Sequence, residues 1–197
     1  MLLAAAIAGG VILLAPGINR SKREEAAGGR RARAAAMAAI VRREAVDQRV
    51  RFASGHTRDP GLAPPQPRLR AREALVTELE QAITADARAR ATSGALTGPI
   101  LYTSCEPYPP GSASAQTDLL AAVGAYQCLA VNLQVKNRAG TVGAIGDPFW
   151  ARIDFARPAF AWCKINPRPG EEAVGANAPS VPLAPVCDLE RPVPAGF

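Results

Sequence analysis

The stretch 126–135, which reads YQCLAVNLQV, decides the fold of this chain. Its apolar residues Leu129, Val131, Leu133 and Val135 recur at every second position. Side chains two residues apart point to the same face of a β-strand. The stretch therefore predicts a strand whose odd-numbered side chains pack against a core.

Three further strands are expected around it, over 100–106, 149–155 and 159–165. Apolar and polar residues also alternate through 149–155. Arg157–Pro158 favours a tight turn between the last two strands. The later connections are too short for crossover helices, so the sheet is expected to be antiparallel.

The strongest amphipathic helix signal precedes these strands, over Arg68 to Thr92. Leu75, Leu79 and Ile83 recur at helical spacing, and Ser93–Gly94 provides a stop. One helix followed by four antiparallel strands predicts an α+β fold, in which the helix covers the apolar face of the sheet. This order of elements is cystatin-like.

The first eighteen residues carry no charged side chain and read as a membrane-spanning helix. Such a helix is about 27 Å long, near the lower limit for a bilayer core. A cleaved signal peptide is the alternative, but no basic residue precedes the apolar run, and Leu13 stands where cleavage requires a small residue. We therefore expect residues 1–19 to be an uncleaved, single-pass transmembrane anchor.

The remaining divisions follow changes of composition. An Ala- and Arg-rich stretch predicts a basic helical stalk, which begins at the capping box Ser21-Lys22-Arg23-Glu24 and is interrupted at Gly28–Gly29. A cluster of prolines then predicts an extended linker. The expected order is anchor 1–19, stalk 20–58, linker 59–67, folded domain 68–190 and tail 191–197.

The net charge of +6 is concentrated in the N-terminal half. Residues 1–97 carry sixteen Lys and Arg against nine Asp and Glu, whereas residues 98–197 carry seven against eight. Basic residues beside a membrane segment bind anionic lipid or set the orientation of the protein in the membrane. We expect the membrane as a partner through residues 1–19, and no nucleic acid, because the C-terminal domain is not basic.

All the cysteines lie in the C-terminal domain, at Cys105, Cys128, Cys163 and Cys187. An even number suits two disulfides in an oxidising compartment. Of the three pairings, we favour Cys105 with Cys128 and Cys163 with Cys187, because each joins segments that are consecutive in the chain. Each closed loop would contribute about 3 kcal/mol to stability.

Two signals disagree about the side of the membrane on which the domain lies. Arg20 and Arg23 come directly after the apolar segment, and the positive-inside rule places the rest of the chain in the cytoplasm. The cysteines favour export instead. Further basic residues upstream of Met1 would reconcile the two signals, and we expect an extracytoplasmic domain at the cell membrane.

The residue inventory argues against several enzyme classes. His56, the sole histidine, lies in the expected stalk, which disfavours a Ser-His-Asp or Cys-His centre in the domain. The cysteines form no C-x-x-C pair, so no zinc site is expected. Gly140, Gly143 and Gly146 precede a strand, which favours a hairpin loop over a phosphate loop. We expect no metal and no cofactor.

Two groups of residues remain as candidate sites. Trp150 and Trp162, bordered by Arg152 and Lys164, would form an exposed aromatic platform if they did not pack in the core, which is the alternative. Several carboxylates near strands suit acid and base roles on a glycan, or ordinary turns and ion pairs. They are Glu106, Asp147 and Asp154, and since no spacing selects a pair, we assign no catalytic residue.

Three runs carry a resemblance: Leu79–Arg90, Cys105–Pro107 and Ala161–Pro167. With the apolar N-terminus and the Arg-rich stalk, they look like uncharacterised membrane-anchored proteins of high-G+C actinobacteria that have a C-terminal four-cysteine domain. The resemblance covers about residues 1–190. Such relatives begin with basic residues that this chain lacks, and the resemblance implies no known activity and no functional residue.

The expected function is therefore non-enzymatic. We expect a binding or scaffolding module of the cell envelope, with an envelope protein or a glycan as its ligand. The alternatives are an exported, carboxylate-dependent hydrolase of cell-wall material and a cytoplasm-facing regulator with free thiols. Nothing in the sequence determines the oligomeric state.

Overall fold

The computed structural model describes residues 2–110, 116–136, 142–166, 168 and 181–191, with the backbone alone for residues 2–19 and 142. The chain forms two compact units, Met1–Arg42 and Arg43–Phe197.

Helix α1 spans Leu2–Asp47 and supplies the first unit. It continues through Gly28 and Gly29, so the predicted interruption is wrong. A glycine inside a helix costs about 1 kcal/mol relative to alanine, and the Ala-rich sequence around this pair favours the helix strongly. Among the described residues, none outside the helix's own backbone lies within 4 Å of a Cβ added at either glycine.

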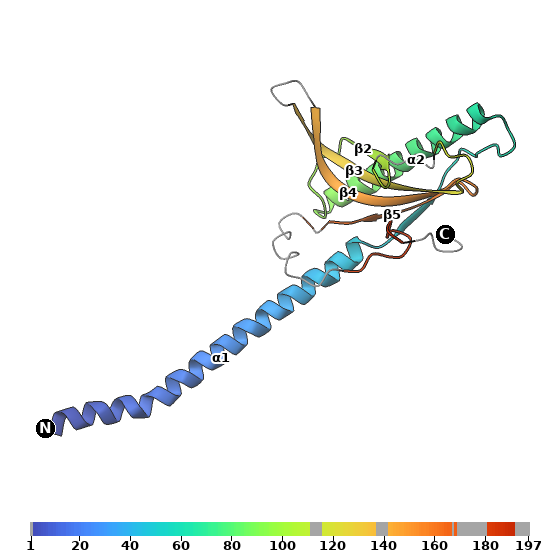
Figure 1. Cartoon of the computed structure of the whole chain (residues 1–197). Coiled ribbons are helices and arrows are strands. Elements are labelled where there is room, and N and C mark those ends of the chain that lie inside the picture. Colours follow the sequence, from blue (N-terminus) through green and yellow to red (C-terminus); the bar gives the residue numbers. More distant parts are fainter. Residues whose placement is uncertain (1, 111–115, 137–141, 167, 169–180, 192–197) are drawn as a thin grey trace. The chain divides into compact units, whose positions relative to one another are not determined.

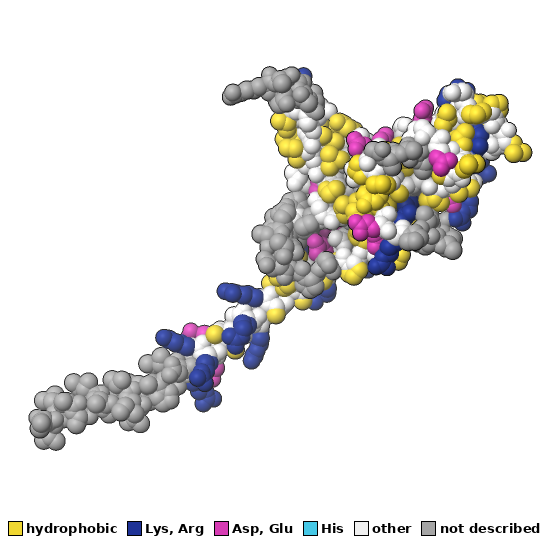
Figure 2. Space-filling model, in the orientation of Figure 1, with side chains coloured by type: hydrophobic (Ala, Val, Ile, Leu, Met, Phe, Trp, Pro, Cys, Tyr) yellow, Lys and Arg dark blue, Asp and Glu magenta, His cyan; other side chains and the backbone are white. Residues whose placement is uncertain are grey.

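The membrane anchor stays a prediction, because the side chains of residues 2–19 lie outside those described. In the part of the chain that the structure describes, no helix combines the length and the apolar character that crossing a bilayer requires. Lys and Arg side chains line α1 beyond that segment (Figure 2). One of them, Arg20, pairs with Glu24 one helical turn away, at 3.0 Å.

The second unit contains a five-stranded antiparallel sheet with one helix against it (Figure 1). The elements are β1 (Arg51–Ser54), α2 (Pro65–Thr92), β2 (Tyr102–Pro107), β3 (Val123–Lys136), β4 (Val142–Asp154) and β5 (Ala159–Lys164). Their order across the sheet is β1-β5-β4-β3-β2. The predicted α+β class and antiparallel sheet are confirmed, and the sheet has five strands instead of four.

The additional strand, β1, lies in the segment that was expected to be stalk. It pairs with β5, with Arg51 opposite Trp162. The strand is too short to show an alternating pattern, and it comes after a stretch of high helix propensity. Helix α1 stops just before it, at Asp47, whose carboxylate pairs with Arg168 at 2.6 Å.

Helix α2 covers one face of the sheet with the stripe that the sequence predicts. Leu75, Leu79 and Ile83 are fully buried there. The helix begins at Pro65, inside the expected linker, because proline is tolerated in the first turn, where its missing N–H would have no helical partner. Gly94 lies just beyond the last turn with a φ of 74°, as expected for a helix stop.

The face of β3 beneath α2 is the opposite of the one predicted. Tyr126, Cys128 and Ala130 lie in the core, whereas Leu133 and Val135 are 52% and 43% exposed. Both faces of β3 carry apolar residues, so the alternation locates the strand without showing which face the helix covers. On β4 the predicted face is right, and its core residues are Phe149, Ala151, Ile153 and Phe155.

A β-bulge shifts the register of β3 and β4 between Val131 and Leu133. Opposite it lies Gly146, where an added Cβ would stand 2.2 Å from the carbonyl oxygen of Ala130. Glycine is thus required for the close approach of the two backbones. Gly143 and Gly146 belong to β4, so their predicted place in a hairpin loop is wrong, although β3 and β4 do pair as consecutive antiparallel strands; Gly140 lies outside the described residues.

Two disulfides brace this unit, in the pairing that the sequence favours. Cys105 is joined to Cys128 between β2 and β3, and Cys163 of β5 is joined to Cys187. No cysteine is free. The second disulfide attaches the C-terminal segment 181–191 to the sheet.

This C-terminal segment lies on the sheet face opposite α2. Cys163, its point of attachment, stands across from Trp150, whereas the next pair along the strands faces the helix. The guanidinium of Arg152 donates to the backbone oxygens of Val186, Asp188 and Arg191, at 2.8, 2.8 and 2.7 Å. The buried side chain of Arg152 therefore fixes the segment to the sheet.

Candidate functional site

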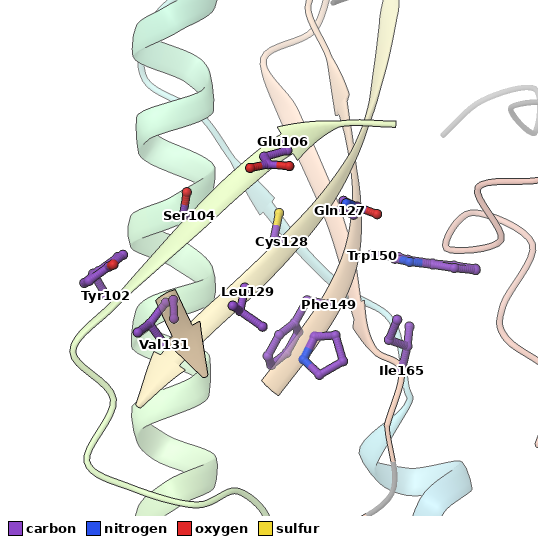
Figure 3. A pocket seen from close by; sticks show the side chains of 12 residues that line it. Tyr102, Ser104, Glu106, Gln127, Cys128, Leu129, Val131, Phe149, Trp150 and Ile165 are labelled. Carbon is purple, nitrogen blue, oxygen red and sulfur yellow. The ribbon is translucent and has the colours of Figure 1, made fainter. Parts of the chain in front are cut away.

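A shallow groove lies beside this segment, on the part of the same face that β2, β3 and β4 form (Figure 3). Its volume is about 430 Å³. Figure 3 shows the lining side chains spread across the three strands, from Tyr102 at one end to Trp150 at the other, and Ile165 lines the groove just beyond β5.

The register of the strands arranges the lining residues in three rows across the sheet. The rows, taken from β2 to β4, are Glu106–Gln127–Trp150, Ser104–Leu129–Pro148 and Tyr102–Val131–Gly146. Neighbouring strands are about 4.8 Å apart, and rows two residues apart are separated by about 6.6 Å. The groove thus has a polar and aromatic end, an apolar floor and a second aromatic end.

The aromatic residues of the groove are placed by specific contacts. Trp150 lies beside Tyr108, with ring centroids 6.0 Å apart and planes inclined at 45°. At the other end, the hydroxyl of Tyr102 accepts a hydrogen bond of 2.9 Å from the side-chain amide of Gln134. Each aromatic ring is therefore held by a neighbour on the rim of the groove.

The polar side chains of the groove contrast with these fixed rings. Ser104, Glu106 and Gln127 make no side-chain hydrogen bond or ion pair with any described residue. Glu106 and Ser104 are exposed, and Gln127 is half-buried. Glu106 is also the only charged side chain that lines the groove in the described part of the chain. These groups are available to a ligand.

The structure does not bring the four residues of the predicted aromatic platform together. Trp150 faces the groove, whereas Trp162 faces α2 and is 5% exposed. Arg152 lies beneath the C-terminal segment, and Lys164 is buried on the same face as Trp162 and donates to the backbone oxygen of Asn166. Burial lowers the pKa of both Arg152 and Lys164.

The three candidate carboxylates are also separated. Only Glu106 lies in the groove. Asp154 accepts the backbone N–H groups of Ala156 and Arg157 at 2.9 and 3.0 Å, and thereby closes the turn from β4 to β5. Asp147 is buried and accepts a hydrogen bond of 2.9 Å from the side chain of Asn166. No acid–base pair converges on the groove among the described residues.

The histidine lies outside the groove. The side chain of His56 is 95% exposed, and its Nδ1 is 3.5 Å from the carboxylate of Glu78 on α2. In the parts of the chain that the structure describes, no group of three or more His, Cys, Asp or Glu side chains is placed to hold a metal ion.

Comparisons with protein-family models, with curated proteins and with solved structures find no match for this chain.

Trp150 and Glu106 were candidates from the sequence, but the rows of side chains in which they lie were not predicted. The missing information was the register of β2 against β3, which the disulfide supplies: Cys105 is directly opposite Cys128. An antiparallel register anchored at these cysteines places Glu106 opposite Gln127. The favoured cysteine pairing thus contained a signal for this part of the site.

Proposed function

We propose that this protein is a membrane-anchored, extracytoplasmic binding module that takes its ligand in the groove over β2, β3 and β4. The observation that carries the proposal is a concave surface whose floor includes the half-buried Leu129 and Pro148, bordered by aromatic rings and by polar side chains that have no described partner. A few polar groups around an apolar concave surface are characteristic of binding sites.

Two features support a domain outside the cytoplasm. All four cysteines are in disulfides, which persist in oxidising compartments. The uncharged run over residues 1–18 suits a membrane anchor. On this proposal the basic part of α1 follows the anchor in the chain and precedes the binding domain.

The two alternative functions have less support. A carboxylate-dependent hydrolase needs two carboxyl groups in one cleft, and the described lining of the groove supplies Glu106 alone. A cytoplasmic regulator that works through free thiols needs reduced cysteines, whereas each cysteine here has a disulfide partner.

The proposal is tested by photo-cross-linking in cells that make the full chain. A benzoylphenylalanine in place of the exposed Ser104, on the groove, is expected to form a discrete adduct. The same group at the exposed Glu73 of α2 is expected to form none, and Trp150→Ala should remove the adduct at position 104. Equal adducts at both positions, or none at position 104, contradict a ligand in the groove.

A further inference from the structure

The geometry points to the chemistry of the ligand: an extended protein segment that places a lysine or arginine side chain between Glu106 and Trp150, with apolar side chains on the floor beyond. This inference rests on the proposed function, because it concerns the same groove.

The charge of the groove favours a cationic ligand. Asp59 and Asp86 of this unit are already paired within the fold, Asp59 with Arg68 and Arg72, and Asp86 with Arg90. Glu106 is exposed and lacks a described partner. A carboxylate at the rim of an apolar surface favours a cationic partner and disfavours an anionic one.

An aromatic pair, Trp150 and Tyr108, lies at the same end of the groove. Trp150 stands in one row with Glu106, separated by Gln127 on the strand between them. The backbone positions of Glu106 and Trp150 are therefore about 10 Å apart. A long cationic side chain laid along this row meets the carboxylate and lies against the indole, where a cation–π contact adds to the attraction.

The spacing of the rows fits an extended segment. Such a segment places alternate side chains about 6.6 Å apart, which is also the separation between rows along the strands. A cationic residue in the first row therefore sets the residue two positions away over Leu129, and the residue four positions away beside the exposed Tyr102 of the third row. The chain already holds one irregular segment, 181–191, on the neighbouring part of this face.

Two backbone positions on the β2 edge of the sheet are unavailable to the same segment. The backbone N–H of Cys105 donates to the carboxylate of Glu80 at 2.9 Å, and Pro107 has no N–H. Strand addition requires free backbone donors and acceptors along an edge. The ligand therefore meets the face of the sheet and its side chains, which makes recognition depend on the residues of the groove.

An array of short peptides tests this inference. Immobilised pentapeptides that carry each of the twenty amino acids at one end, with apolar residues two and four positions away, are probed with the full chain in detergent micelles. Terminal lysine and arginine are expected to bind about tenfold more tightly than terminal norleucine, and terminal glutamate more weakly than either. The preference should decline as salt is raised.

Three variants separate the inference from the proposed function. Glu106→Gln should remove the preference for cations and leave the apolar binding, Trp150→Ala should weaken every peptide, and Glu73→Gln, on α2, should change nothing. Binding that depends on Trp150 but shows no cationic preference overturns the inference alone. No binding by the unmodified chain, or binding that Trp150→Ala leaves intact, overturns both.

Discussion

The indole N–H of Trp162 donates to the carboxylate of Asp86 across 3.0 Å, which joins β5 to α2. Removal of this donor by Trp162→Phe is expected to lower the free energy of unfolding by about 2 kcal/mol, because a hydrogen bond to a charged acceptor is lost from a buried site. Urea denaturation monitored by circular dichroism measures the loss. Trp150→Phe, on the groove face, should cost less, and an equal loss in both variants contradicts the assigned role of Trp162.

Gly146→Ala is expected to destabilise the domain by about 2 kcal/mol, because its Cβ would collide with the backbone of β3 at the bulge. Gly143→Ala is the matched control on the same strand, since the nearest atom to its Cβ is the carbonyl oxygen of Val135, at 3.8 Å. Thermal unfolding of both variants compares them. Similar melting temperatures for the two would show that the bulge tolerates a side chain.

Hydrogen bonds from the guanidinium groups of Arg68 and Arg72 hold the pKa of Asp59 well below its usual range. A carboxyl group whose pKa is lower in the folded state stabilises the fold above its unfolded pKa of about 4, and loses this effect as the pH falls towards the folded pKa. Stability should therefore decline below about pH 4. Asp59→Asn should be less stable at pH 7 and decline less steeply.

Denaturation midpoints between pH 7 and pH 2 measure this effect. Glu190→Gln removes an exposed carboxylate and is the control, which should behave as the unmodified protein does. If Asp59→Asn matches the unmodified protein at pH 7, the ion pairs between residue 59 and α2 contribute no stability.

Replacement of both Cys163 and Cys187 by serine is expected to cost about 3 kcal/mol, because the disulfide closes a loop with a sequence separation of 24 residues. It should also release the C-terminal segment, so that limited proteolysis cleaves within residues 181–191 first. The buried Arg152 would then lose its three carbonyl partners. Unchanged protease resistance would mean that Arg152 alone holds the segment.

The proposed location predicts a pattern of maleimide labelling. All four cysteines should label in intact cells only after reduction with an impermeant reductant, because they are paired and face the exterior. Labelling in lysate without reduction, with none in intact cells, would instead place reduced thiols in the cytoplasm and contradict the proposed extracytoplasmic location.

The elements with a long regular pattern were predictable from sequence. The stripe of Leu75, Leu79 and Ile83 locates α2 and its buried face, because apolar residues at helical spacing form one continuous stripe. The alternation of apolar and polar residues at every second position locates β3 and β4. On β3, however, Tyr126 and Cys128 compete with Leu129 and its neighbours for the core, and only the tertiary packing decides between the two faces.

Short and non-local features were not predictable. Strand β1 has four residues, and its partner β5 lies more than a hundred positions away, so no local pattern marks it. The bulge that requires Gly146 depends on two strands at once. The separation of Trp150 from Trp162 is of the same kind, since the positions of both strands in the sheet determine which ring α2 covers.

The backbone N–H of Cys105 is bonded to Glu80 and Pro107 has no N–H, which affects how copies of the protein behave at high density. Open sheet edges pair with one another through backbone hydrogen bonds. Proteins with such edges polymerise when many copies are confined together, as they are in the plane of a membrane. Here Glu80 occupies one edge donor and Pro107 eliminates another. Copies at high surface density are thus protected against fibrillar assembly along β2.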